Sequence, residues 1–396
     1  MKPVLLAALL AFPLASVPAF AQTATATAVK ASAPAGAVTA AAVVGHYAAL
    51  VQATYDDTLG GATALQTSIQ SFIDKPSAEG LANARKSWIA AREFYGQTEA
   101  FRFYSGPIDD KNGPEGQINA WPMDESYVDY VKDAPNAGII NKKSAITKKG
   151  LASLNEKNGE ENIATGWHAI EFLLWGQDLS TTGPGERSFE DFVDGKKPNA
   201  DRRRLYLKVV TELLVDDLTF LSKSWAPGAK NYRAKFEKGG MESVRKMFVG
   251  LGSLSRGELA GERLEVALAS QAQEDEHSCF SDNTHRDVVN NAKGIQNVWL
   301  GSYKRADGST VQGASLRDLV AVKNSALAEK TTQQIGASVT AAEGIQAPFD
   351  REIIGAKDAP GRLRVQKTVD SLIEQSKDLV AAANAAGITK LTLVKP

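Results

Sequence analysis

The segment "DRRRLYLKVVTELLVDDLTFLSKSW" (201–225) decides the fold class. Its apolar residues recur at steps of three or four, which is the period of one face of an α-helix. Asp201 stands where an N-cap belongs, and Pro227 and Gly228 follow the last apolar residue, so the pattern predicts a helix over 201–225. The apolar stripe consists of Leu207, Val210, Leu214, Leu218, Leu221 and Trp225.

Two further segments carry the same helical period. The segment "RVQKTVDSLIEQSKDLVAAANAAG" (364–387) predicts a helix with Gly387 as its C-cap, and "LANARKSWIAAREFYGQTEAFRFY" (81–104) predicts another that ends before Gly106 and Pro107. Period-2 alternation of β-branched residues is nearly absent, so we predict an all-α fold built from helical bundles. We expect loops at 105–117, 180–188 and 304–313.

Length and patterning predict two domains. A chain of 396 residues exceeds the usual ~150 residues of one domain, and a boundary near 227–231 gives two parts of bundle size. We therefore expect helical-bundle domains at 43–228 and 229–390. Each part carries one histidine-containing segment, "GWHAIE" and "SDNTHRD", which is compatible with a duplicated unit.

The N-terminus has the features of an export signal. Residues 1–21 combine Lys2, an apolar stretch and an Ala-x-Ala site, so we expect a cleaved signal peptide, a periplasmic location and no transmembrane segment. Residues 22–42 are rich in alanine and threonine without an apolar period, which predicts a disordered linker. Cys279 is the single cysteine, so no intramolecular disulfide forms. We expect it to be a buried small side chain, with a metal or redox role as the alternative.

Charge narrows the range of partners. The formal net charge is −1, and lysines and arginines are scattered along the chain. A nucleic-acid-binding protein usually carries a basic stripe, which this sequence lacks. We therefore expect small ligands, metal ions or other proteins as partners.

The segment "TGWHAIEFLLWGQD" (165–178) places two polar side chains in an otherwise apolar run. His168 and Glu171 are three residues apart, so they share one face of a helix, and Trp175 follows on the same side. Burying this pair without partners is costly. One interpretation is a metal site, because imidazole nitrogen and carboxylate oxygen both bind zinc or iron. The alternative is a histidine–glutamate hydrogen bond inside a packed core.

A metal site needs more ligands than this pair. Asp282 and His285 are also three residues apart, and they follow an acidic run, 274–276, that ends at His277. We interpret that acidic run as a solvated face. The helix predicted at 81–104 places Glu99 on the same stripe as Arg92, Trp88 and Tyr95, where it is either a ligand or part of a salt-bridged face.

Several enzyme signatures are missing. No H-E-x-x-H motif occurs, and Phe172 follows Glu171 where an H-x-x-E-H motif needs histidine. The glycine-rich segment 250–264 follows no predicted strand, so it is not a phosphate-binding loop; its glycines instead allow close helix approach or a bend. We interpret His46 as a structural residue.

These residues together resemble the imelysin family, and within it the iron-regulated, imelysin-like proteins. The resemblance rests on Gly166, His168 and Glu171, which form the G-x-H-x-x-E motif of that family, and it extends over most of the chain from about residue 43 to 388. Further matching segments are "SGPID" (105–109), "AWPMDE" (120–125), "GELAGER" (257–263), "EDEHSCFSDNTHRD" (274–287) and "NVWLGSY" (297–303).

The resemblance implies two helical bundles with a functional site in the cleft between them, and an exported bacterial protein linked to iron acquisition. We therefore expect the chain to bind iron, another divalent metal or an iron source. His168 and Glu171 would be ligands, completed by Glu99, Asp282 or His285, with Gly166, Trp175, Arg92 and Trp88 in support.

Two alternatives remain. A zinc metallopeptidase would use Glu99 as its general base. A protein that presents cargo to an envelope uptake partner would use the His168–Glu171 pair only to hold the site together.

Overall fold

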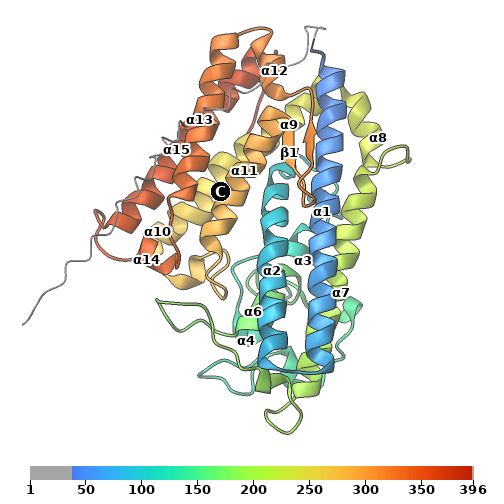
Figure 1. The fold of residues 1–396 in the computed structure, drawn as a ribbon, viewed down its shortest axis with the longest axis vertical. Coiled ribbons are helices and arrows are strands. Elements are labelled where there is room, and N and C mark those ends of the chain that lie inside the picture. The colour runs from blue at the N-terminus through green and yellow to red at the C-terminus, as the bar shows by residue number, and fades with distance from the viewer. Residues whose placement is uncertain (1–37, 395–396) are drawn as a thin grey trace, which may run out of the picture. The chain divides into compact units, whose positions relative to one another are not determined.

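Helices make up nearly all of the regular structure in residues 38–394, which are the residues that the computed structural model describes (Figure 1). The all-α fold class predicted from the sequence is confirmed. The elements are α1 (Ala40–Asp74), α2 (Ala78–Thr98), η1 (Glu99–Phe101), α3 (Glu115–Asn119), α4 (Glu125–Val128), η2 (Ile139–Asn141), α5 (Lys148–Leu154), α6 (Gly166–Trp175), η3 (Phe189–Phe192), α7 (Ala200–Trp225), α8 (Tyr232–Phe236), η4 (Glu237–Gly239), α9 (Met241–Ser253), η5 (Leu254–Glu265), α10 (Val266–Ser270), η6 (Gln273–Asp275), α11 (Thr284–Leu300), β1 (Ser302–Lys304), β2 (Thr310–Gln312), α12 (Leu316–Ala321), α13 (Ser325–Glu343), α14 (Asp350–Ile353) and α15 (Pro360–Ala385).

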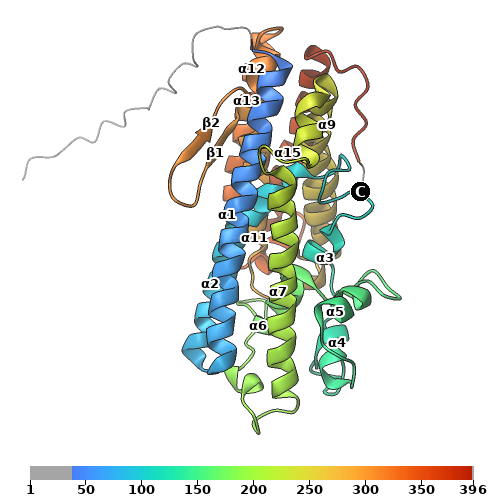
Figure 2. The same ribbon diagram turned by 90° about the vertical axis from the view of Figure 1, so that its right-hand side faces the viewer.

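Helices α1, α2 and α7 form one group, with α6 packed against α2 and α7 (Figure 2). All six residues of the predicted apolar stripe on α7 are buried. The predicted N-cap is wrong, because α7 begins at Ala200 after Asn199, which has a left-handed backbone with φ 57°. Asp201 lies instead in the first turn, where its negative charge favours the helix N-terminus.

A second group consists of α11, α13, α15 and a continuous helical run from α9 through η5 to α10. The segment η5 is a π-helix of 12 residues within this run, and it packs against α15. Gly250 on α9 faces the backbone of η1, because a Cβ there would lie 2.8 Å from the carbonyl oxygen of Ala100. This close approach is the use predicted for the glycine-rich segment. The C-terminal helix ends as predicted within one residue, since its C-cap is Ala386 and Gly387 follows with φ +94°.

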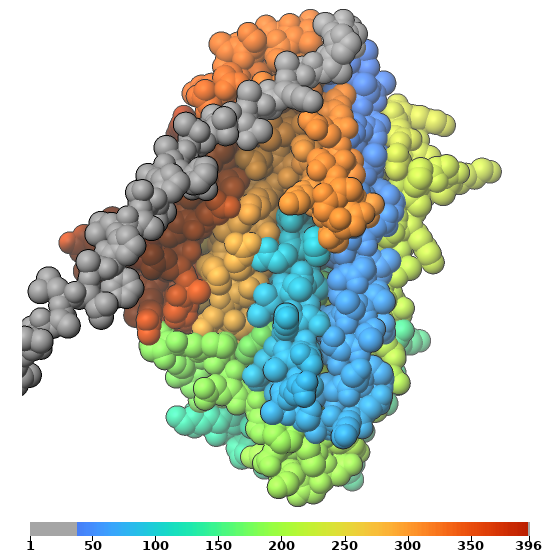
Figure 3. Space-filling model, viewed as in Figure 1, coloured from blue at the N-terminus to red at the C-terminus, as the bar shows by residue number. Residues whose placement is uncertain are grey.

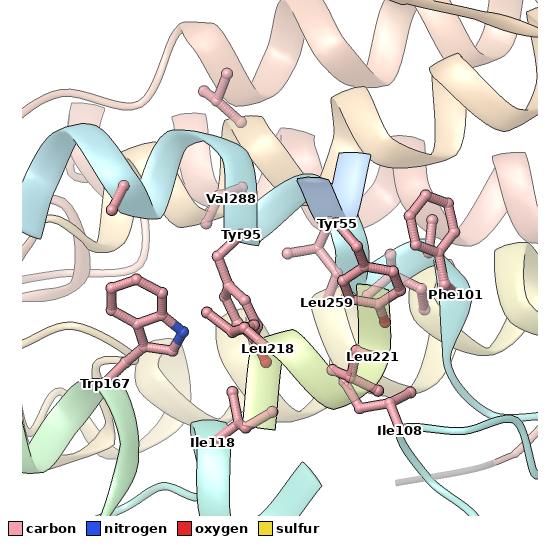
Figure 4. Packing of buried hydrophobic residues seen from close by; sticks show 14 of the residues in the cluster. Tyr55, Tyr95, Phe101, Ile108, Ile118, Trp167, Leu218, Leu221, Leu259 and Val288 are labelled. Carbon is pink, nitrogen blue, oxygen red and sulfur yellow. The ribbon is translucent and has the colours of Figure 1, made fainter. Parts of the chain in front are cut away.

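Helix α2 of the first group packs along α11 of the second. Residues from Val38 onward form one compact unit. The two-domain division near residue 228, the duplication and a cleft between the halves therefore remain predictions. Figure 4 shows the core near this junction, where Tyr95 and Trp167 lie near Ile118, and Tyr55 and Phe101 pack edge to face with ring centroids 5.8 Å apart.

The predicted loop at 304–313 is wrong in part, because β1 and β2 form an antiparallel hairpin there, with Tyr303 opposite Val311. Strands of three residues are too short for a period-2 pattern to be visible in the sequence. The hairpin packs against α1, beside its upper half in Figure 3, and the Tyr303 hydroxyl donates to Asp57 at 2.9 Å.

Helix α1 begins at Ala40, so the predicted linker ends earlier than residue 42. The Thr39 side chain caps the helix by accepting from the Ala42 N–H at 3.2 Å. The predicted signal peptide and linker residues 22–37 lie outside the described residues. In the described part of the chain, we find no helix with both the length and the apolarity needed to span a bilayer.

Candidate functional site

Helix α6 carries the His168–Glu171 pair, and all ten of its residues are buried. The helix begins at Gly166, whose φ of +81° is unfavourable for a residue with a side chain. A Cβ at this position would lie 2.3 Å from the carbonyl oxygen of Ile118. The glycine of the motif therefore lets α6 start directly against the backbone of α3.

His168 and Glu171 are hydrogen-bonded to each other. Nδ1 of His168 lies 2.9 Å from Oε2 of Glu171, and the exposed fractions of the two side chains are 1% and 0%. Oε1 of Glu171 accepts from the N–H and the hydroxyl of Ser281 at 2.9 and 2.7 Å. Within the described residues, Nε2 of His168 has no hydrogen-bond partner although it is buried. The arrangement leaves one imidazole nitrogen without a partner.

Burial dominates the electrostatics of this pair. It raises the pKa of Glu171 to about 8, although the hydrogen bonds from Ser281 act in the opposite direction. Burial, followed by the positive charge of Arg92, holds the pKa of His168 well below its ordinary value. The imidazole is therefore neutral near neutral pH, which is the form that binds metals.

A second histidine–carboxylate pair lies beside the first. The rings of His168 and His277 pack edge to face with centroids 4.8 Å apart. Nδ1 of His277 lies 2.8 Å from Oδ2 of Asp287, and its Nε2 lies 3.3 Å from Nδ2 of Asn119. Burial, together with the charge of Arg263, lowers the pKa of His277 to about 3. Two neutral imidazoles, each held by a carboxylate, thus lie side by side.

The Arg92 guanidinium lies beside these histidines. Its guanidinium donates to Asp287 at 2.8 Å and to Asn119 at 2.7 Å, and its central carbon lies 5.2–5.7 Å from three aromatic ring centroids. These rings belong to Trp88, Tyr95 and Trp167. Trp88 also packs edge to face on Trp175 at 5.4 Å. Trp88 therefore contacts both Arg92 and Trp175, and the supporting role of these residues stays a prediction.

Glu99 belongs to a separate ion-pair network. Its Oε2 accepts from Arg102 at 2.6 Å and from Arg263 at 2.8 Å. Burial alone would raise the pKa of Glu99, but the two arginines outweigh it and lower the value to about 2. This carboxylate is held ionised by arginines, so the structure does not place it as a ligand or general base beside His168.

Asp282 and His285 do not join the pair either. Asp282 lies with Asp178 and Asp350, and these three form the one group of at least three potential metal ligands within 4.8 Å of one another among residues 38–394. Nδ1 of His285 lies 3.1 Å from the backbone carbonyl oxygen of Asp282, and the side chain is partly exposed. The expectation that these residues complete a shell around His168 and Glu171 is corrected by this geometry.

Other residues of the site were missed or misread in the sequence. Asp287, Asn119 and Ser281 contact the histidine pairs through hydrogen bonds across 10 to 158 positions, which no local pattern reveals. Glu276, read as part of a solvated acidic run, is fully buried. Cys279 is buried with a free thiol, as predicted.

Comparison with known proteins identifies the family. The imelysin family model matches residues 51–379, which is most of the chain. The chain belongs to the imelysin family. The resemblance seen in the G-x-H-x-x-E motif is thereby confirmed.

Individual relatives agree with this membership. Iron-regulated protein A of Synechococcus elongatus is 25% identical over 350 residues, which are 87% of this imelysin-family chain and 87% of that protein. Two crystal structures share the fold. An iron-regulated protein A precursor from Parabacteroides distasonis has a TM-score of 0.68 at 20% identity, over 87% of this chain and 94% of that chain. An imelysin-like protein from Psychrobacter arcticum has a TM-score of 0.61 at 14% identity, over 87% and 96%.

Proposed function

We propose that this imelysin-family protein binds iron or another divalent metal ion at His168, and that it serves bacterial iron acquisition in the periplasm. The observation that carries the proposal is the buried Nε2 of His168, which lacks a hydrogen-bond partner in the described part of the chain. A relative named iron-regulated protein A supports iron as the metal.

The geometry supports a specific division of roles. Histidines that bind metals usually donate their second ring N–H to a carboxylate, which fixes the tautomer and orients the ring. The Glu171 carboxyl group lies against Nδ1 of His168 in this way, and the Asp287 carboxylate lies against Nδ1 of His277. We therefore assign Nε2 of His168 as a ligand and Glu171 as the group that orients it, rather than as a ligand itself. His277 is the nearest second ligand, because its Nε2 faces only the long contact with Asn119.

Burial limits what the site holds. The exposed fractions of His168 and His277 are 1% and 2%, so a small ion fits the surroundings better than haem or a bulky iron chelate. The same burial weighs against the zinc metallopeptidase alternative, because a peptidase needs an open metal position that polypeptide and water reach. Absence of chelator-sensitive cleavage of an unfolded polypeptide by zinc-loaded protein would remove that alternative.

Metal content after loading tests the proposal. The protein from residue 22 onward is stripped, loaded in turn with ferrous iron, ferric iron and zinc, desalted and measured by elemental analysis. We expect His168→Ala to hold about one ion per chain less than wild type while its helical circular dichroism persists. His46→Ala is the matched control, because His46 Nε2 is already bound to the Gly301 carbonyl oxygen at 2.8 Å. Equal metal content in wild type and His168→Ala would contradict the proposal.

A further inference from the structure

A second group of acidic side chains lies outside the histidine site. Asp178 follows α6, Asp282 precedes α11, and Asp350 begins α14, so three distant segments of the chain meet here. One carboxylate oxygen of each lies within 4.8 Å of the others, and all three side chains are buried. The cluster neighbours the histidine site through the chain, because Ser281, which donates to Glu171, is followed directly by Asp282.

A fourth carboxylate points to the same place. Glu276 has an exposed fraction of 0%, and neither of its oxygens has a hydrogen-bond partner in the described residues. Burial raises the pKa of Glu276 to about 10, and the next contributions in size are the charges of Asp350, Asp282 and Asp178. Glu276 therefore lies near the three aspartates, although its oxygens are not among those within 4.8 Å of one another.

The negative charges of these carboxylates have few partners in the described part of the protein. Among residues 38–394, no lysine, arginine or histidine forms an ion pair with any of the four carboxylates. Of the four, only Asp178 receives hydrogen bonds from the part of the chain that the structure describes: from the Ser180 N–H at 2.9 Å and from Gln273 at 2.6 Å. Both oxygens of Asp350 and Oδ1 of Asp282 are buried without a partner.

Buried carboxylates in this arrangement must either take up protons or hold a cation, because several unpaired negative charges in a low-dielectric interior are unstable. Shared protons would leave most of the carboxylate oxygens without a donor, since each proton serves only one contact. A single divalent cation would contact the three aspartates at once and would offset the charge of the neighbouring Glu276.

We propose that Asp178, Asp282 and Asp350, with Glu276 beside them, form a calcium-binding site, distinct from the histidine site. All donors are hard carboxylate oxygens, which favour calcium or magnesium over zinc and copper. The three aspartate oxygens lie within 4.8 Å of one another, which one ion at calcium–oxygen distances of about 2.3–2.6 Å spans. Calcium accepts an irregular set of carboxylate oxygens, whereas magnesium demands near-ideal octahedral geometry. The ion would tie α14 to the loops beside α6 and α11.

The site has a route from the surface. Asp178 lines a surface pocket of about 710 Å³, whose other lining residues lie mainly in the loop 176–187. Asp178 is the member of the aspartate cluster that lines this pocket. Ordering Asp282 would also fix the neighbouring Ser281, which holds Glu171 in place.

Calorimetry and thermal melting test the calcium site. The protein from residue 22 onward is treated with a chelator, desalted and titrated with CaCl₂ near neutral pH. We expect one calcium ion per chain and a higher melting temperature with calcium. Asp350→Asn should weaken calcium binding by at least about tenfold. The same substitution should raise the melting temperature of the calcium-free protein, because it removes a repelling charge.

Two controls separate this site from the others. Asp217→Asn neutralises a half-buried carboxylate elsewhere, whose pKa burial raises to about 6, and should leave calcium affinity unchanged. His168→Ala should also leave the calcium affinity unchanged, so the calcium site and the proposed iron site are tested independently. If Asp350→Asn does not fold, Asp178→Asn and the titration of wild type decide. Absence of calcium uptake by wild type, tighter binding of Mg²⁺ or Fe²⁺ than of Ca²⁺, or equal calcium affinity in the variant would overturn the proposal.

Discussion

Replacing Glu171 by glutamine tests the orienting role of this residue. The shape is kept, and the carboxylate that Glu171 presents above its raised pKa of about 8 is replaced by a neutral amide. In the wild type, the Ser281 N–H and hydroxyl both donate to Oε1 of Glu171. The glutamine oxygen therefore stays on Ser281, and its NH₂ group faces Nδ1 of His168, 2.9 Å away in the wild type. Nδ1 must then accept, which moves the ring proton to Nε2, the atom assigned to the metal.

The expected loss follows from this wrong tautomer. Removing an orienting partner of a metal-binding histidine costs about 10–100-fold in affinity, which is about 1.4–2.7 kcal/mol. A competition titration of ferrous iron or zinc against a coloured chelator measures it above about pH 8, where wild-type Glu171 is ionised. Asp57→Asn is the control, because Asp57 accepts from Tyr303 and lies outside the site. A metal affinity of Glu171→Gln equal to that of wild type would refute the reasoning.

The same variant has a defined stability profile. Burial raises the pKa of Glu171 from 4.5 to about 8. A carboxyl group with a raised folded-state pKa favours the folded state at low pH, and this contribution is lost as pH rises from about 4.5 through about 8. Glutamine does not ionise, so Glu171→Gln should gain stability relative to wild type over this range. Chemical denaturation at several pH values measures the difference.

Three further changes have defined outcomes. Gly166→Ala should lower the free energy of unfolding by at least about 1–3 kcal/mol, because φ is +81° and a Cβ would collide with Ile118. Thermal melting measures the loss. An unchanged melting temperature would be evidence against the tight start of α6. Glu99→Gln should cost about 3–5 kcal/mol near neutral pH. The pKa of Glu99 is lowered to about 2, so this stabilisation is present above pH 4.5 and is lost as pH falls through about 2. Urea denaturation should therefore show the free energies of unfolding of wild type and variant converging in acid. A difference that stays constant with pH would contradict the ion-pair assignment. Asp129→Asn should cost a similar ~3–5 kcal/mol, because fully buried Asp129 accepts from Arg203 at 2.6 Å; a change below about 1 kcal/mol in denaturant unfolding would argue against a buried pair.

The long helices could be predicted because their pattern is local. The stripe that ends at Trp225 repeats every three or four residues, and burial of one helix face requires this repeat whatever the partner is. The hairpin at Tyr303 could not be predicted, because its strands are three residues long and are held by the side of α1 and by Asp57. The observed N-cap of α7 is Asn199, two residues before the predicted Asp201, because the exact helix start also depends on tertiary contacts.

The candidate site could be predicted only in part. His168 and Glu171 share one helix face, so their pairing follows from spacing alone. The contact between His168 and His277 joins segments 109 positions apart and depends on how α6 packs against the chain before α11. Glu99 was expected on the same face of the predicted helix as Arg92. It instead pairs with Arg102, three residues further along the chain, and with Arg263, which is 164 positions away and could not be predicted from local spacing.

An anomalous difference map would show directly whether His168 binds iron. Crystals of the protein from residue 22 onward would be grown anaerobically with ferrous iron, and data would be collected at the iron absorption edge. We expect an iron peak at bonding distance, about 2 Å, from Nε2 of His168, with Glu171 still hydrogen-bonded to Nδ1. A map with no iron peak at His168, or with iron only among Asp178, Asp282 and Asp350, would contradict the proposal.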